Sequence, residues 1–239
     1  MIRLAVSGCQ GRMGQRIAAL AKADSQLQLS VLLEHKDHPK AKEAPHGIAI
    51  STSSDALKEA DVLIDFTTPE ATLLNLKACT QHGVKMVIGT TGLTPAQIGE
   101  IRQASTKIPI VYSSNMSVGV NILFRLANML AEKATSDYTV TMTEAHHIHK
   151  KDAPSGTAKT LAEIIEKASG RKVSDIQSIR EGEIIGDHEV VFESPEDTLT
   201  IKHHAKNRDI FAKGSLVAAK FLATKTKGLF SMQDVLGLS

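Results

Sequence analysis

Long segments of a single character are missing from this sequence, and each absence excludes a class of protein. There is no long run of lysine and arginine and no interleaving of basic with aromatic residues, the aromatics being only 3% of the chain, so we expect no nucleic-acid partner. The opening MIRLAVSGCQGR has only a short apolar stretch, too short for a signal peptide or a membrane-spanning helix. We therefore expect a cytoplasmic protein without a membrane partner.

Cysteine is scarce as well. Cys9 and Cys79 lack the close spacing of a metal site, and a reducing compartment would keep both as thiols, so we interpret them as structural. What is present is typical of a globular protein: 42% hydrophobic and 23% charged residues, with a formal net charge of +2. A chain of 239 residues can bury a substantial core in one large or two modest domains.

Short apolar runs alternate with amphipathic stretches over the first part of the chain. Runs such as VLIDF and VKMVIG are almost entirely apolar, as expected for strands buried on both faces of a parallel sheet. The pattern predicts strands at 2–7, 29–34, 62–66, 84–89 and 108–113, with helices between most of them. This indicates an α/β fold with a Rossmann-like doubly wound parallel sheet.

The pattern changes after Asn115. We predict helices at 117–134, 155–168 and 215–224, and strands at 138–145, 173–180, 188–193 and 198–203. Gly170 follows the second of these helices, where a C-terminal glycine is expected. The order indicates a second, α+β domain with a mixed sheet. We therefore predict one domain of residues 1–116, joined by the C-terminal segment 209–239, and another of residues 117–208.

A glycine loop, GCQGRMG, follows the first strand and precedes an apolar-periodic helix. Gly8, Gly11 and Gly14 let the chain turn tightly and bring backbone N–H groups and the positive helix N-terminus to a pyrophosphate. Glu34 ends the second strand about twenty residues later, where dinucleotide-binding folds place an acid for the ribose hydroxyls. The sequence therefore predicts a site for NADH or NADPH.

The choice between the two cofactors stays open. Glu34 favours the free hydroxyls of NADH, whereas His35 and Lys36 are placed to approach the 2′-phosphate of NADPH. The segment GTTG, from Gly89 to Gly92, ends another strand at the edge where ligands bind in open α/β sheets. It is a candidate for the nicotinamide, although many loops share such a turn signal.

The densest concentration of reactive groups is EAHHIHKKDAPSGT, residues 144–157, at a strand end and a helix start. Its three histidines titrate near neutral pH, and Lys150 and Lys151 attract anions. Its Ser-Gly-Thr turn offers hydroxyls and unsatisfied helix N–H groups, which suit a carboxylate. We place the reaction here.

Two other interpretations explain this segment less well. Histidines bind zinc, but His146 and His147 point to opposite faces of an extended chain and no cysteine pair or HExxH helix completes a ligand set, so we expect no metal. An ordinary surface role suits any single histidine. It does not account for so dense a cluster.

The segments GCQGRMG, GTTG, SSNMSVG, EAHHIHKKDAPSGTA and GLFSMQDVLGL, in this order over nearly the whole chain, resemble the 4-hydroxy-tetrahydrodipicolinate reductase (dihydrodipicolinate reductase) family. The resemblance implies an NAD(P)H-dependent enzyme of lysine and diaminopimelate biosynthesis. Its reaction reduces a cyclic unsaturated dicarboxylate to tetrahydrodipicolinate. The resemblance also implies a homotetramer formed through the sheet of the second, substrate-binding domain.

Residue roles follow from the same resemblance. It implies that His146 is the proton donor and Lys150 its partner, with His147, Gly156 and Thr157 binding substrate. It implies dinucleotide contacts at Gly8, Cys9, Gln10, Gly11, Arg12, Met13, Glu34, His35, Gly89, Thr90, Thr91, Ser113, Ser114, Asn115 and Met116. The chain departs from the family's usual pattern in having Ile148 and His35 where arginine is common, and in a short stretch after Glu34.

Three points stay open. Arg208 lies where the chain should return to the first domain and is a candidate for a substrate carboxylate, although a surface arginine is as plausible. Another two-domain NAD(P)-dependent oxidoreductase of a small acid would share the fold, but it has no reason to carry HHxHKxDAPSGT. A non-catalytic dinucleotide sensor would bind the cofactor without turnover and leaves the histidines unexplained.

Overall fold

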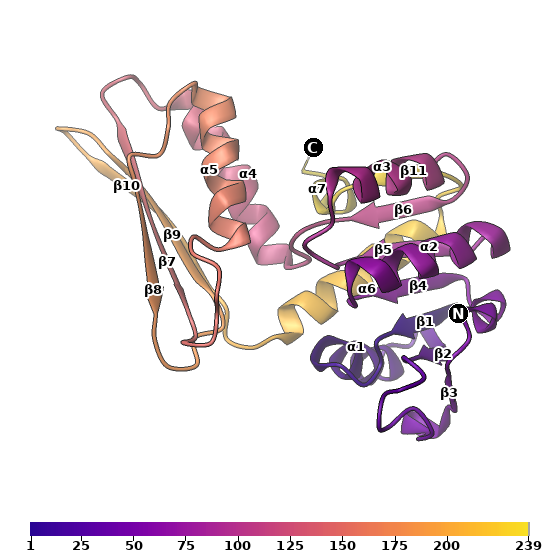
Figure 1. The fold of residues 1–239 in the computed structure, drawn as a ribbon. Coiled ribbons are helices and arrows are strands. Elements are labelled where there is room, and N and C mark those ends of the chain that lie inside the picture. The colour runs from indigo at the N-terminus through magenta and orange to yellow at the C-terminus, as the bar shows by residue number, and fades with distance from the viewer. Residues whose placement is uncertain (239) are drawn as a thin grey trace. The chain divides into compact units, whose positions relative to one another are not determined.

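The computed structural model describes residues 1–238 and divides into two compact units. The first unit contains residues 1–117 and 211–237, so the C-terminal part of the chain joins the N-terminal part (Figure 1). The second unit contains residues 118–210 together with Leu238. Ser239, the last residue of the predicted C-terminal segment, lies outside the described residues. Within residues 1–238 no helix is both long and apolar enough to cross a membrane.

The first unit is built on a seven-stranded sheet in the order β11-β6-β5-β4-β1-β2-β3, and every neighbouring pair is parallel. The strands are β1 (Ile2–Ser7), β2 (Leu27–Leu33), β3 (Ile50–Ser51), β4 (Val62–Asp65), β5 (Lys85–Ile88), β6 (Pro109–Tyr112) and β11 (Gly228–Phe230). Because β2 and β4 flank β1, the strand order reverses at β1, where doubly wound sheets bind ligands. The predicted Rossmann-like fold is confirmed.

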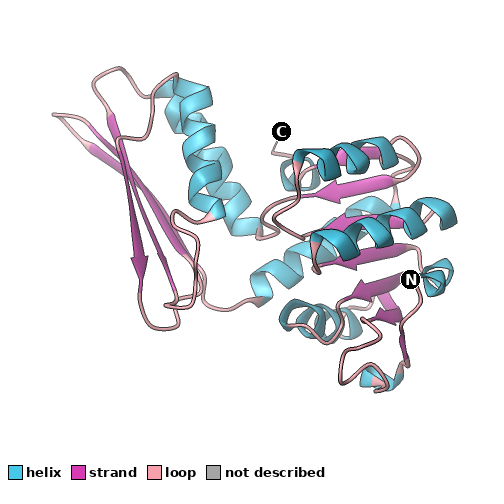
Figure 2. Ribbon diagram, viewed as in Figure 1, coloured by secondary structure: helices cyan, strands magenta, loops and turns pink. Residues whose placement is uncertain are grey.

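Helices cover both faces of this sheet (Figure 2). They are α1 (Arg12–Lys22), α2 (Pro69–His82), α3 (Pro95–Ala104), α6 (Asp209–Ala223) and α7 (Met232–Leu236), with short 3-10 helices η1 (Pro45–Gly47) and η2 (Ser54–Glu59). Leu4 and Val6 of β1 pack in one apolar cluster with α1 and α6, whereas Ala5 packs in another with α2 and α3. Alternate residues of β1 thus bury on opposite faces, which explains the continuous apolar runs.

The second unit has a four-stranded mixed sheet in the order β10-β9-β7-β8, as predicted. Strand β7 is parallel to β8, and β9 is antiparallel to both β7 and β10. Its elements are α4 (Val118–Lys133), β7 (Thr139–His146), α5 (Gly156–Ser169), β8 (Asp175–Arg180), β9 (Asp187–Glu193) and β10 (Thr198–His204). The two helices share an apolar cluster with the sheet that includes Phe124, Leu161 and Phe192.

Capping residues in the sequence explain where α5 begins and ends. Ser155 caps α5 by accepting a hydrogen bond from the Ala158 N–H at 3.2 Å, and Gly170 ends it in the left-handed conformation at φ 68°. The predicted start of the last helix was wrong, because α6 begins at Asp209 rather than at 215. Gly214 weakens the helical pattern there, but it is needed: a Cβ at this position would lie 1.7 Å from the Met116 carbonyl oxygen.

Replacing two helical glycines with alanine should therefore have opposite effects on the free energy of unfolding. Gly214→Ala should destabilise the protein by about 1–3 kcal/mol, because α6 must move away from Met116. Gly99→Ala in α3, where a Cβ meets nothing within 4 Å, should stabilise it by about 0.5–1 kcal/mol. Urea denaturation of both variants measures the two changes, and equal changes would contradict this account of α6.

Candidate functional site

The glycine loop joins β1 to α1 by close backbone contact. Gly8 has φ +66°, and its carbonyl oxygen accepts a hydrogen bond from the Gly11 N–H at 2.9 Å. A Cβ on Gly14 would lie 2.1 Å from the same oxygen, so only glycine fits where the helix meets the loop. No side chain caps α1 at Gly11, which leaves its first N–H groups to an anionic ligand.

Glu34, directly after β2, is held beside this loop. Its carboxylate accepts hydrogen bonds from the Gln10 N–H and from the His35 N–H, both at 2.9 Å. A cavity of about 600 Å³ is lined by Gly8, Gly11, Glu34 and His35, among others. The structure thus brings four of the predicted dinucleotide contacts together at one cavity.

The turn after β4 lines the same cavity and was missed in the sequence. Phe66, Thr67 and Thr68 contribute to its wall, and Thr68 caps α2 by accepting a hydrogen bond from the Ala71 N–H at 3.4 Å. A Cβ on Gly89 would lie 2.4 Å from the Phe66 ring, so the GTTG segment requires its first glycine for packing. A signal was available, since doubly wound order makes β4 the neighbour of β1.

A buried carboxylate, hydrogen-bonded to the cavity residues Thr67 and Asn75, connects three strand ends. Asp65, the last residue of β4, accepts hydrogen bonds from the Thr67 N–H at 2.9 Å, from Asn75 Nδ2 at 2.8 Å and from Thr90 Oγ1 at 3.3 Å. Asn75 also donates to Ser7 Oγ at 2.8 Å. Burial raises the pKa of Asp65 above its ordinary value. The Thr90 hydroxyl is therefore hydrogen-bonded within the first unit.

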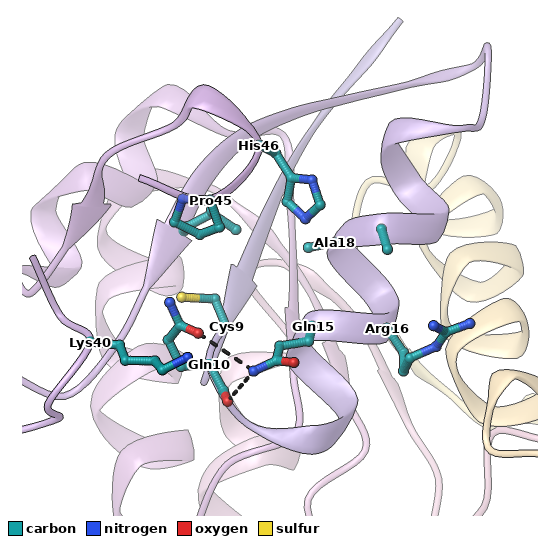
Figure 3. Close-up of a pocket in the computed structure, with 10 residues that line it drawn as sticks. Cys9, Gln10, Gln15, Arg16, Ala18, Lys40, Pro45 and His46 are labelled. Atoms are coloured by element: carbon teal, nitrogen blue, oxygen red, sulfur yellow. Dashed lines mark hydrogen bonds between the residues drawn. The ribbon is translucent and has the colours of Figure 1, made fainter. Parts of the chain in front are cut away.

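Other predicted dinucleotide contacts lie elsewhere. The Cys9 side chain is buried, and burial raises the pKa of its thiol to about 12. Cys9 and Gln10 line a separate cavity of about 360 Å³, in which Gln15 Nε2 donates to the Gln10 carbonyl oxygen at 2.9 Å (Figure 3). Met116 is buried in the core, whereas Arg12, Thr91 and Ser114 are exposed.

The loop after β6 is organised by its own side chains. Ser113 Oγ donates to the Asn115 carbonyl oxygen at 2.8 Å, and Asn115 Oδ1 accepts from the Ser117 N–H at 2.9 Å. Met13, in the first turn of α1, is half-buried and packs against the cluster under that helix. Ser113 and Asn115 thus stabilise the loop after β6 through hydrogen bonds to its backbone.

In the second unit, the end of β7 carries a buried pair of acid and base. His146 Nδ1 lies 2.5 Å from Glu144 Oε2, and the Glu144 side chain has no exposed surface. Arg180 of β8 donates to both oxygens of this carboxylate, at 2.7 and 3.1 Å. The N–H of Ser155, at the start of α5, donates to Oε1 at 3.2 Å.

The protonation states of this cluster follow from its burial and charges. Burial lowers the pKa of His146 below its ordinary value, although the Glu144 carboxylate opposes the shift. Burial alone would raise the pKa of Glu144, but hydrogen bonds from Arg180, Ser178 and His146 keep it below its usual value. Burial also lowers the pKa of His188 to about 4. His188 is therefore neutral near pH 7, and Glu144 is ionised.

Further charged and polar groups surround the same strand end. Lys150 pairs with Asp152 at 2.9 Å and is close enough for its charge to lower the pKa of His146. His147 is half-buried, and its buried Nδ1 has no hydrogen-bond partner within the described structure. Gly156 and Thr157 open α5, next to Ser155. The residues predicted for catalysis and substrate binding thus all lie at one strand end and the helix start beside it.

Two members of this cluster were missed. Arg180 faces His146 in the pairing of β7 with β8, and His188 faces Glu144 in the pairing of β7 with β9. Glu144 itself was quoted without a role, although residues two apart share one face of a strand. Arg208 lies between β10 and α6. No group of three metal-binding side chains occurs among residues 1–238.

Comparison with known proteins covers both units. The family profile "Dihydrodipicolinate reductase, N-terminus" matches residues 2–116, and "Dihydrodipicolinate reductase, C-terminus" matches residues 119–236. The 4-hydroxy-tetrahydrodipicolinate reductase of Nitrosomonas eutropha is 42% identical over 265 residues, covering 100% of this chain and 99% of that protein. The enzyme of the same name from Nitrosomonas europaea is 43% identical, covering 99% and 98%.

A solved structure agrees. The dipicolinate-bound dihydrodipicolinate reductase from Paenisporosarcina sp. TG-14 has a TM-score of 0.84, covering 98% of both chains, and at 24% identity this similarity shows the fold. The relatives' names confirm the prediction of an NAD(P)H-dependent reductase, rather than a dinucleotide sensor. Since the profiles match nearly all residues from 2 to 236 and the relatives align over almost their whole length, this chain belongs to the dihydrodipicolinate reductase family.

Proposed function

We propose that this protein reduces 4-hydroxy-tetrahydrodipicolinate (dihydrodipicolinate) to tetrahydrodipicolinate with NADH or NADPH, in lysine and diaminopimelate biosynthesis, with His146 as proton donor and Lys150 assisting. Membership of the family makes it a reductase of a small molecule that uses a nicotinamide dinucleotide. The observation that carries the residue roles is the buried His146–Glu144 pair, which lies beside Lys150 and the first turn of α5.

The first unit fits the cofactor. The close approach of the Gly8 backbone to Gly14 and the uncapped first turn of α1 allow backbone N–H groups to hold a pyrophosphate. Glu34 offers a fixed carboxylate to ribose hydroxyls. The bound dinucleotide supplies the hydride, and the second unit's residues supply the proton and the binding of the substrate.

His146 gives a proton to the carbon next to the one that is reduced. Ionised Glu144 accepts hydrogen bonds only, so the imidazole places a hydrogen on Nδ1 and exchanges the proton at Nε2. A Cβ on residue 186 would lie 3.1 Å from Nε2, so glycine at this position avoids crowding of that nitrogen by a side chain. General acid catalysis of this kind contributes ~10²- to 10⁴-fold in rate.

A dicarboxylate finds complementary groups at the same place. Lys150 carries a positive charge, and the first N–H groups of α5 at Gly156 and Thr157 favour an anion. His147 Nδ1 is a further buried group without a partner among residues 1–238. The related reductase from Paenisporosarcina binds dipicolinate, a planar dicarboxylate. These features support a dianionic substrate for this chain.

The proposal extends to assembly and location. Helices α4 and α5 share one apolar cluster with the sheet of the second unit, and Thr139, Thr141, Thr200 and Lys202 are exposed on its strands. An open sheet face supports the proposed homotetramer, which we place in the cytoplasm. The two compact units likewise support a division into a dinucleotide-binding domain (1–116 with 209–239) and a substrate-binding and oligomerisation domain (117–208).

Turnover tests the function directly. With the substrate generated enzymatically in the cuvette, adding NADH or NADPH should give a protein-dependent fall in nicotinamide absorbance. The fall should require the substrate-generating enzyme. If neither dinucleotide is oxidised under conditions where both bind, the proposed substrate is wrong.

His146→Gln tests the proton donor. It should lower kcat by ~10²-fold or more while dinucleotide affinity stays unchanged, because the ring acts only on the reacting carbon. His204→Gln is the matched control, since His204 Nδ1 also lies near a carboxylate, Asp187 Oδ1, at 2.6 Å, but at an exposed site. Stopped-flow turnover gives kcat for each. A His146→Gln enzyme with normal kcat would remove this residue from the reaction.

Glu34→Gln tests the ribose role. The change should weaken NADH more than NADPH, because a charged acceptor for the 2′-hydroxyl is lost while repulsion of the 2′-phosphate is relieved. Glu43→Gln is the control, since Glu43 is an acid that contacts Gln10 Nε2 at 3.3 Å. It should affect both dinucleotides alike. Fluorescence titration measures the dissociation constants, and equal losses in Glu34→Gln would contradict the assignment.

A further inference from the structure

Hydrogen bonds from three different elements converge on the Glu144 carboxylate, and the Ser178 side chain of β8 contributes one besides the four described next. Oε2 accepts from His146 Nδ1 and Arg180 Nη1, and Oε1 accepts from Arg180 Nη2 and the Ser155 N–H. A buried carboxylate is tolerated only when its oxygens are satisfied in this way. The arrangement therefore defines one position of the carboxylate and of each donor.

This geometry fixes the His146 ring. Arg180 keeps Glu144 ionised, and an ionised carboxylate can only accept, so His146 must present Nδ1–H to it. The His188 ring stands edge-on to the His146 ring with centroids 5.2 Å apart, and its Nε2 lies within hydrogen-bond distance of Ser155 Oγ, at 3.1 Å. The His146 ring cannot turn over without losing the hydrogen bond between Nδ1 and Glu144.

The same ion pair holds the groups that would bind the substrate. Ser155 donates its N–H to Glu144 and caps α5 with its hydroxyl, so the first turn of α5 is tied to the carboxylate that orients His146. Arg180 Nη2 also donates to the Asp152 carbonyl oxygen at 2.5 Å, and Asp152 pairs with Lys150. The Glu144–Arg180 ion pair thus connects the proposed proton donor His146, the Lys150 ammonium group and the N-terminus of α5.

We propose that Glu144 and Arg180 are positioning residues of the reaction: together they hold His146 with Nε2 as its proton-exchanging nitrogen, in a fixed position relative to Lys150 and the first turn of α5. The inference rests on the proposed role of His146 as proton donor. It assigns no contact with the substrate to either residue.

The charges around His146 determine its pKa, and removing one of them should shift that pKa in a known direction. Glu144, on the same strand, raises the pKa of His146, whereas Lys150 from the following loop and Arg180 from β8 lower it. His188 of β9 is neutral in this range, with a pKa lowered to about 4, and the start of α5 presents Ser155 without a charge. Removing the acid and removing the arginine should therefore move the titration of His146 in opposite directions.

The test is the pH dependence of kcat in two variants. A proton donor must be protonated, so kcat falls as pH rises through its pKa in the complex. Glu144→Gln should move this alkaline limb to lower pH and reduce kcat at neutral pH at least about tenfold. Arg180→Gln should move the limb to higher pH. The dissociation constant of the dinucleotide should stay unchanged in both.

A merely structural role would not give opposite shifts. Asp187→Asn is the matched control, because it removes the carboxylate next to His204 in the same sheet and should leave the limb in place. Should Glu144→Gln fail to fold, the direction of the shift in Arg180→Gln decides alone. If the limb disappears in His146→Gln but does not move in these variants, this inference fails and the role of His146 stands. If His146→Gln keeps the limb and the rate, the proposed role of His146 fails first.

Discussion

A buried carboxylate at the end of a strand organises each unit of this protein. Burying such a group is unfavourable unless its oxygens are hydrogen-bonded, and Asp65 and Glu144 both meet this condition with no exposed surface. Asp65 does so with neutral donors from Thr67, Asn75 and Thr90, and burial raises its pKa. Through these bonds and the bond from Asn75 to Ser7, it holds together the ends of β1, β4 and β5 next to the glycine loop.

The burial of Glu144 is offset instead by an ion pair with Arg180. Arg180 supplies a charge as well as hydrogen bonds, so the pKa of Glu144 stays below its ordinary value despite full burial of the side chain. The difference matches the proposed tasks of the two units. A network of neutral donors is sufficient for a scaffold, whereas a residue that exchanges protons needs a neighbour whose own charge does not change.

The sequence predicted those features that depend on local pattern. Apolar runs identified the parallel sheet, Ser155 and Gly170 located α5 to within one residue, and spacing placed Glu34 at the glycine loop. The strands β3 and β11 were not predicted, because two and three residues are too few to show a period. Arg180 was missed for another reason: its contact with Glu144 spans 36 residues and depends on which strands pair.

The lowered pKa of His146 has a consequence for the order of events in the proposed reaction. Without substrate, burial and the nearby charges of Lys150 and Arg180 disfavour the imidazolium, so the ring is mostly neutral at pH 7. A dianionic substrate bound by Lys150 and the first turn of α5 would offset these positive charges and raise the pKa of His146 again. The proton would then be present on Nε2 chiefly when there is a substrate to receive it. Glu144 allows this exchange because it stays ionised throughout and keeps the ring in place in both protonation states.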